Sequence, residues 1–139
     1  MLMREVLNAT DVRKDWGKFI DTVVHEKPKI VKRNRDYFLS LSLNHVDNLL
    51  KDVCFKVTLI NEDDGSVTAT LENLDLVVNA ENEIAARKAM AEELLNYAKE
   101  YFEEFQLYYN SLNRRPHFPY VLKVLIQKDL EGIIGLLHA

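Results

Sequence analysis

The spacing of apolar and polar residues predicts an α+β unit over residues 1–51. A short strand is expected over residues 3–8, and Thr10 is the expected N-cap of a helix that runs to His25. The apolar residues of that helix recur at spacings of three, four and seven, which predicts one buried face; they are Val12, Trp16, Phe19, Ile20, Val23 and Val24. A hairpin of strands 29–32 and 37–43 and a short helix over 44–51 complete the unit.

The pattern restarts after residue 51 and predicts a second α+β unit over residues 52–139. Strands 54–60 and 67–71 form an expected hairpin with an acidic tip at residues 61–66, a third strand covers 74–79, and one helix spans 81–110. One small hairpin cannot cover the apolar stripe of so long a helix, so we expect a partner or a second copy to pack on it. The stripe consists of Ala91, Leu94, Leu95, Ala98, Tyr101, Phe102, Phe105 and Tyr108.

The last segment follows a break at residues 114–119. Residues 120–126 fit either a strand or a buried helix, and periodicity does not decide between them. Asp129 is the expected N-cap of a final helix. This tail is too apolar to hang free, so it packs on its own domain or on another protein.

Composition indicates a globular protein, with 47% hydrophobic and 29% charged residues and no excess typical of disorder. Cys54 is the single cysteine, which excludes an internal disulfide, and its place in a strand predicts an inert buried thiol. No signal-like run follows Met1 and no stretch reaches eighteen uncharged apolar residues, so we expect a cytoplasmic protein without a membrane span.

Charge is divided unequally between the two halves. The net charge is −4, but residues 1–51 carry ten Lys and Arg against seven Asp and Glu, whereas residues 52–139 carry eight against fifteen. The halves therefore have net charges of +3 and −7. This asymmetry favours an anionic partner for the first half and a cationic partner for the second.

Patterns typical of catalysis or cofactor binding are weak. The four histidines share no short spacing, the acidic tip lacks the DxDxDG pattern of a calcium loop, and four glycines provide no phosphate-binding loop. We therefore expect no enzyme, no cofactor and no metal site. The enzyme alternative is a ribonuclease that uses His45 or His117 with a carboxylate.

A basic cluster and an aromatic run are the clearest candidate binding features. Five cationic residues fall within residues 27–35, and Arg13 and Lys14 add two more; together they could follow a phosphate backbone, the alternative being an ordinary solvated turn. The cluster consists of Lys27, Lys29, Lys32, Arg33 and Arg35. Glutamates surround the aromatic residues of 97–109, which favours a core or a protein interface over base stacking.

Four short motifs follow one another in the first 51 residues: NATDVR at 8–13, KPKIVKRNR at 27–35, YFLSLS at 37–42 and the pair Leu49-Leu50. In their order and spacing, these motifs resemble the Phd/YefM antitoxin family. This resemblance implies a homodimer that binds the operator DNA of its own operon and holds a toxin with the rest of the chain. Trp16-Gly17 and Asp36 depart from the family pattern.

The resemblance also implies roles for individual residues. Thr10 and Arg13 match the helix-start motif associated with DNA contact, and Arg33 and Arg35 match the basic turn; Lys14 and Lys32 join this DNA-binding set on charge alone. We expect a partner or dimer interface at Trp16, Tyr101, Phe105 and Tyr108.

The order of elements after residue 52 is loosely similar to HicB-like antitoxins. An acidic surface there suits a basic toxin, as RelE-type ribonucleases tend to be. The sequence therefore predicts an antitoxin that neutralises a toxin and represses its own operon. The alternative is an interaction or ligand-sensing module of the same fold that does not bind DNA.

Overall fold

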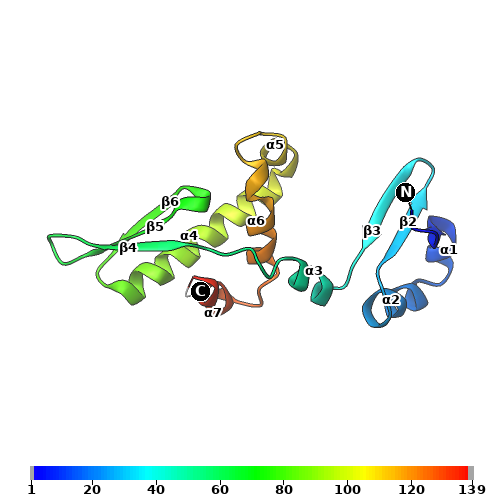
Figure 1. Ribbon diagram of the computed structural model, residues 1–139, viewed down its shortest axis with the longest axis horizontal. Helices are drawn as coiled ribbons and strands as arrows, with labels where there is room; N and C mark the ends of the chain where they lie inside the picture. Colours follow the sequence, from blue (N-terminus) through cyan, green and yellow to red (C-terminus); the bar gives the residue numbers. More distant parts are fainter. Residues whose placement is uncertain (1, 138–139) are drawn as a thin grey trace. The chain divides into compact units, whose positions relative to one another are not determined.

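The computed structural model describes residues 2–137, which form two compact units, one ending at Leu49 and the other beginning at Leu50 (Figure 1). Each unit contains its own three-stranded sheet together with helices. The predicted α+β class is therefore confirmed.

Unit 1 is a parallel strand pair extended by a hairpin. Strand β1 (Val6–Asn8) pairs in parallel with β2 (Lys29–Arg33), and β2 pairs antiparallel with β3 (Asp36–Ser40). A parallel pair needs a crossover connection, which α1 (Ala9–Lys14) and α2 (Trp16–His25) supply. Helix α3 (Leu43–Leu49) ends the unit. Its small core consists of Val12, Phe19, Val23 and Val31.

The predicted single helix over residues 11–25, with Thr10 as its N-cap, is wrong, because the helix is interrupted at Asp15. Asp15 leaves the helical region (φ −137°, ψ 67°), and its side chain accepts a hydrogen bond from Lys18 N at 3.3 Å. This capping bond starts a new helix. Helix α1 also begins earlier than predicted, so Thr10 lies in its first turn and Asn8 occupies the N-cap position.

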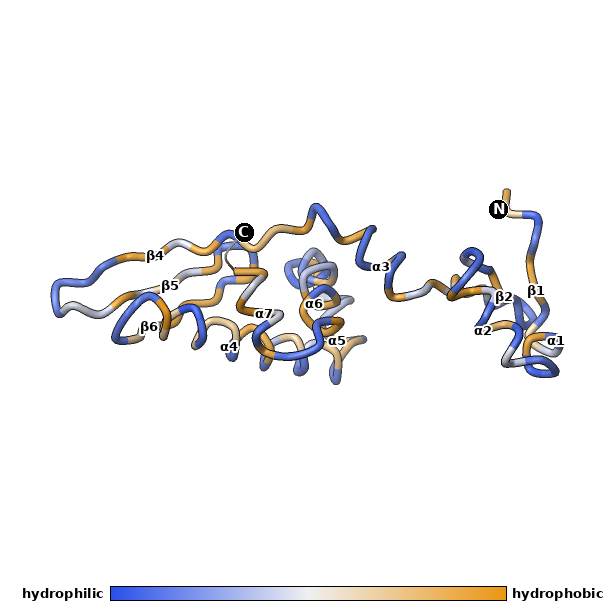
Figure 2. Tube along the Cα trace, turned by 90° about the horizontal axis from the view of Figure 1, so that it is seen from below, coloured by the Kyte–Doolittle hydropathy of each residue, from blue (hydrophilic) through white to orange (hydrophobic). Residues whose placement is uncertain are grey.

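Unit 2 is an antiparallel sheet covered by helices. Strands β4 (Val57–Asn61), β5 (Val67–Leu71) and β6 (Leu76–Ala80) pair in chain order, with a 3₁₀ turn η1 (Glu72–Leu74) before β6. The β4–β5 tip is hydrophilic (Figure 2), and Gly65 adopts a φ of 88° there. The remaining elements are α4 (Glu83–Glu103), α5 (Phe105–Tyr109), η2 (Arg115–His117), α6 (Phe118–Leu125) and α7 (Leu130–Leu136).

The core of unit 2 covers most of the apolar stripe of α4 from within the chain. Strand β5, α6 and α7 all contribute buried residues to the cluster that contains Leu94, Ala98 and Tyr101 of α4. The ambiguous segment 120–126 thus belongs mainly to a helix, and its apolar residues cover the stripe. Asp129 caps α7 as predicted, accepting from Gly132 N at 2.9 Å.

Two further expectations for unit 2 are wrong. The long helix breaks at Glu104 (φ −107°, ψ 43°), which separates α4 from α5. Cys54 precedes β4 and is exposed, because its neighbour Phe55 takes the buried position and packs edge-on against Tyr120 at 5.3 Å between ring centroids.

Candidate nucleic-acid and partner surfaces

The start of α1 and the β2–β3 turn line one groove on unit 1. Its volume is about 260 Å³, and its lining residues are Asn8, Ala9, Thr10, Asp11, Lys32, Arg33 and Asn34. The parallel register explains this arrangement, because it sets Asn8 opposite Lys32 and so brings the residues that follow β1 beside the end of β2. The structure therefore brings together Thr10, Lys32 and Arg33 of the predicted DNA-binding set.

The cationic groups at this groove have only weak partners within unit 1. Arg33 Nη2 lies 3.9 Å from Asp36 Oδ2, and both side chains are largely exposed. An exposed ion pair of this kind contributes at most about 1 kcal/mol. Lys32 Nζ lies 5.4 Å from the centre of the Tyr37 ring, a cation–π contact. Both cations can therefore exchange these contacts for an anionic ligand at little cost.

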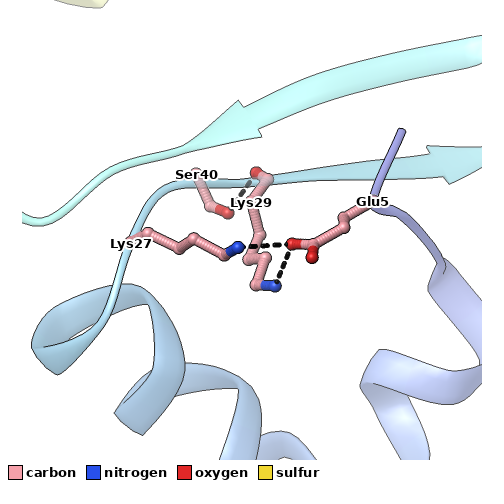
Figure 3. Close-up of polar contacts among 4 residues, drawn as sticks. All are labelled: Glu5, Lys27, Lys29 and Ser40. Atoms are coloured by element: carbon pink, nitrogen blue, oxygen red, sulfur yellow. Dashed lines mark hydrogen bonds and ion pairs between the residues drawn. The ribbon is translucent and has the colours of Figure 1, made fainter. Parts of the chain in front are cut away.

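Two other cations of the basic cluster have a structural role (Figure 3). Glu5 Oε2 lies 2.7 Å from Lys27 Nζ and 3.1 Å from Lys29 Nζ, while Ser40 Oγ donates to the Lys29 carbonyl at 2.7 Å. Hydrogen bonds from Lys27 and then Lys29 lower the pKa of Glu5. These contacts tie the residue before β1 to β2, so Lys27 and Lys29 stabilise the strand pairing that forms the groove.

The remaining predicted DNA-binding residues lie outside the groove lining. Arg13 and Lys14 occupy the last turn of α1, and Arg35 follows Asn34 in the β2–β3 turn. All three side chains are exposed. Arg35 is next to the groove in sequence, whereas Arg13 and Lys14 lie at the end of α1 away from Asn8.

Unit 1 also exposes an unusual amount of apolar surface. Trp16, Ile20 and Val24 recur every four residues along α2 and are 41–58% exposed, with Trp16 packed on Phe19 at 5.4 Å. Strand β3 is an edge strand, and Tyr37, Phe38 and Leu39 are each at least half exposed. Apolar residues thus reach solvent on both faces of β3, and its outer backbone edge is unpaired in the described sheet.

The predicted interface residues of unit 2 divide between core and surface. Tyr101 is 0% exposed, and its hydroxyl donates to the Arg114 carbonyl at 2.9 Å, so it lies in the core of unit 2 and not on its surface. Phe105 and Tyr108 are half-buried, whereas Phe102 is 52% exposed. Spacing alone does not reveal this difference, because Phe102 follows the buried Ala98 by four residues and so shares its helix face.

A polar network surrounds a pocket of about 240 Å³ in unit 2, lined in part by Asp75, Tyr97, Arg114 and His117. Arg114 Nη1 donates to Tyr97 Oη at 3.0 Å, and Tyr97 Oη lies 2.6 Å from His117 Nδ1. The hydroxyl oxygen of Tyr97 has two lone pairs, so it accepts from Arg114 and shares a second hydrogen bond with His117 Nδ1, whose direction depends on the tautomer of the imidazole. Burial and then the Arg114 charge lower the pKa of His117, which favours the neutral imidazole.

The described residues, 2–137, also bear on metal binding and on membrane spanning. In this range, no group of three or more His, Cys, Asp or Glu side chains is placed to hold a metal ion. Nor does any helix in the same range have the length and apolar character needed to cross a membrane.

Comparison with known proteins supplies the family. The sequence profile of the PHD_like family, described as antitoxins of RelE/RelB toxin–antitoxin systems, matches residues 3–139. The chain belongs to this antitoxin family. A similar crystal structure comes from Syntrophomonas wolfei subsp. wolfei and is described as the antitoxin part of a proposed toxin–antitoxin system. The two sequences are 40% identical, the TM-score is 0.89, and the match covers 96% of each chain. No curated protein matches the chain.

The extent of the family match broadens the resemblance seen in the sequence. The antitoxin profile includes both units, whereas the Phd/YefM motifs lie within residues 1–51. The second unit, which the sequence likens loosely to HicB-like antitoxins, is thus part of the same family as the first. Family membership makes the protein an antitoxin of a RelE/RelB-type system and not an enzyme, even though His117 lies in a pocket with Asp75.

Proposed function

We propose that this antitoxin is a homodimer that binds the operator DNA of its own operon through unit 1 and neutralises a RelE-type toxin by direct contact with unit 2. DNA binding represses transcription of the operon, and contact with unit 2 blocks the toxin. Both activities are binding events without covalent chemistry.

The groove lined by Thr10, Lys32 and Arg33 carries the DNA-binding part of the proposal. Its two cations have weak internal partners and lie at the end of β2, which the pairing with β1 holds in place. Lys and Arg contacts to phosphates dominate the affinity of proteins for DNA, and a hydroxyl such as that of Thr10 can also donate to a phosphate oxygen. Exposed Arg13, Lys14 and Arg35 extend the basic surface.

The exposed apolar residues of unit 1 support a dimer. Its core is small for an independently stable domain, while Trp16, Phe38 and Leu39 remain more than half exposed. A second copy that packs on α2 and β3 covers these side chains and gives β3 a partner. A twofold dimer then presents two grooves to a palindromic operator.

The acidic character of unit 2 supports toxin binding there. Residues 52–139 have a net charge of −7, and opposite charge on a basic ribonuclease accelerates encounter and suppresses wrong partners.

Operator binding as a function of salt concentration tests the proposal. We expect Arg33→Ala to weaken binding and to reduce the slope of log K against log salt by about 1.8, because a dimer loses two phosphate contacts at about 0.9 each. Lys18→Ala is the matched control, since it removes an exposed cation of unit 1 that does not line the groove. A slope that Arg33→Ala leaves unchanged would remove this groove from the DNA interface.

Co-expression with the product of the neighbouring gene tests the toxin-binding part. We expect relief of growth arrest and recovery of a complex. If neither occurs, the toxin-neutralising function is refuted, whatever the DNA-binding result.

A further inference from the structure

Unit 2 presents an aromatic surface where the end of α4, α5 and the start of α6 meet. Four rings form a continuous cluster, with centroid distances of 5.9 Å for Phe102–Phe105, 5.2 Å for Phe105–Tyr109, 5.1 Å for Phe105–Phe118 and 5.5 Å for Tyr109–Phe118. Phe102 is 52% and Tyr109 36% exposed, while Phe105 and Phe118 are half-buried. Exposed aromatic side chains that cluster in this way are typical of binding hot spots.

The aromatic rings of this region already bind guanidinium groups of their own chain. The Arg115 guanidinium lies 5.0 Å from the centre of the Tyr109 ring, and that of Arg114 lies 5.5 Å from the centres of both Tyr97 and Tyr108. These distances are within the range of cation–π attraction. The same interaction is available to a cation that approaches the exposed face of Phe102.

Exposed carboxylates adjoin the aromatic surface in the sequence. Glu103 and Glu104 are exposed and lie in sequence between Phe102 and Phe105. Burial and, after it, the charge of Glu100 raise the pKa of Tyr108, which indicates that a third carboxylate lies close to the Tyr108 ring next to this surface in the sequence. An aromatic face flanked by carboxylates offers a Lys or Arg side chain both a cation–π contact and an ion pair.

We propose that the aromatic surface formed by Phe102, Phe105, Tyr109 and Phe118, with Glu103 and Glu104 at its border, is the docking site for an Arg- or Lys-bearing segment of the toxin. The inference rests on the proposed toxin-neutralising function and specifies where on unit 2 that contact is made. A second copy of the chain fits this surface poorly, because a twofold contact brings the same carboxylates against one another.

Affinity measurements with purified toxin test the docking site. Wild-type antitoxin and two variants are titrated, Phe102→Ala and the double charge reversal Glu103→Lys/Glu104→Lys. Matched controls on the same helix are Ile84→Ala, which removes an 84% exposed apolar side chain about 27 Å away along α4, and Glu92→Lys, which reverses an exposed charge. The double variant alters only exposed side chains, so it tests the site even if Phe102→Ala folds poorly.

We expect each test variant to weaken toxin binding by about 10-fold or more and each control to change it by less than about 3-fold. The charge reversal should lower the association rate most at low salt. If wild type binds toxin and both test variants bind as tightly, the docking site is wrong while the toxin-neutralising function stands. If wild type binds no toxin, both fail. A loss of self-association in Phe102→Ala, with toxin affinity retained, would assign the surface to a second copy.

Discussion

Tyr101 and Phe102 are consecutive residues, but the structure predicts that truncating their side chains to alanine affects different properties. Tyr101 is fully buried and donates to the Arg114 carbonyl, whereas Phe102 is half exposed. We therefore expect Tyr101→Ala to act on the stability of unit 2 and Phe102→Ala to act mainly on toxin binding.

The size of the difference follows from the buried area. A fully buried aromatic side chain removes roughly 200 Å² from water, which at about 25 cal/mol per Å² corresponds to about 5 kcal/mol of unfolding free energy for Tyr101. Phe102 keeps about half of its surface exposed, so the same reasoning gives an upper bound of about 2.5 kcal/mol. Tyr101→Phe retains the ring and loses one hydrogen bond, at a cost of about 1 kcal/mol.

Urea unfolding followed by far-UV circular dichroism measures these changes, because the 21-residue helix α4 lies in unit 2. Fluorescence of Trp16, the single tryptophan, reports on unit 1 and should not change between the variants. From the highest to the lowest urea midpoint, the expected order is wild type, Tyr101→Phe, Phe102→Ala and Tyr101→Ala. A midpoint for Tyr101→Ala as high as that of Phe102→Ala would show that Tyr101 does not belong to the core.

Further predictions concern pH and backbone conformation. Burial and then Arg114 lower the pKa of His117, so the unfolded chain binds more protons near pH 6; unit 2 should lose stability as the pH falls below about 6.5, and His117→Gln should flatten this dependence in thermal melts between pH 8 and 5. Two lysines lower the pKa of Glu5, so its stabilising contribution is present above its usual pKa of 4.5 and is lost as the pH falls through the folded-state value. Acid unfolding of wild type and of Glu5→Gln, monitored by tryptophan fluorescence, measures this contribution. Identical acid-unfolding curves for the two proteins would contradict this role of Glu5. Gly65→Ala should destabilise unit 2 by about 1 kcal/mol because φ is 88°, whereas Gly17→Ala, with open space around the added methyl, should stabilise unit 1 by about 0.5–1 kcal/mol in urea melts.

Local patterns predicted most of the elements but not where the helices break. Asp15 and Glu104 interrupt runs whose apolar spacing is continuous, and neither break involves Pro. At Asp15 a capping bond to Lys18 N competes with continuation of the helix, and an Asp in such a position is compatible with either outcome. Alternation along residues 54–60 also left open which of the neighbours Cys54 and Phe55 faces the core, and Phe55 takes the buried position.

The candidate DNA-binding surface shows what charge counting misses. Each of the five cations of residues 27–35 adds one positive charge to the count. In the structure, however, Lys27 and Lys29 form ion pairs with Glu5, while Lys32 and Arg33 line the groove. The distinction depends on a residue 22 positions before Lys27 in the chain, and it arises only because β1 pairs with β2.

The sequence by itself determined most of the order of strands and helices, the opposite charges of the two halves and the resemblance to antitoxins, because these follow from local spacing and residue type. Tertiary structure decided which side chains are available to a partner. A helix period shows that a face is apolar but not what covers it: Tyr101 is buried within unit 2, while Trp16 and the apolar residues of β3 remain exposed. Burial is a property of non-local packing, and the surfaces proposed for DNA, toxin and a second copy are those that packing leaves uncovered.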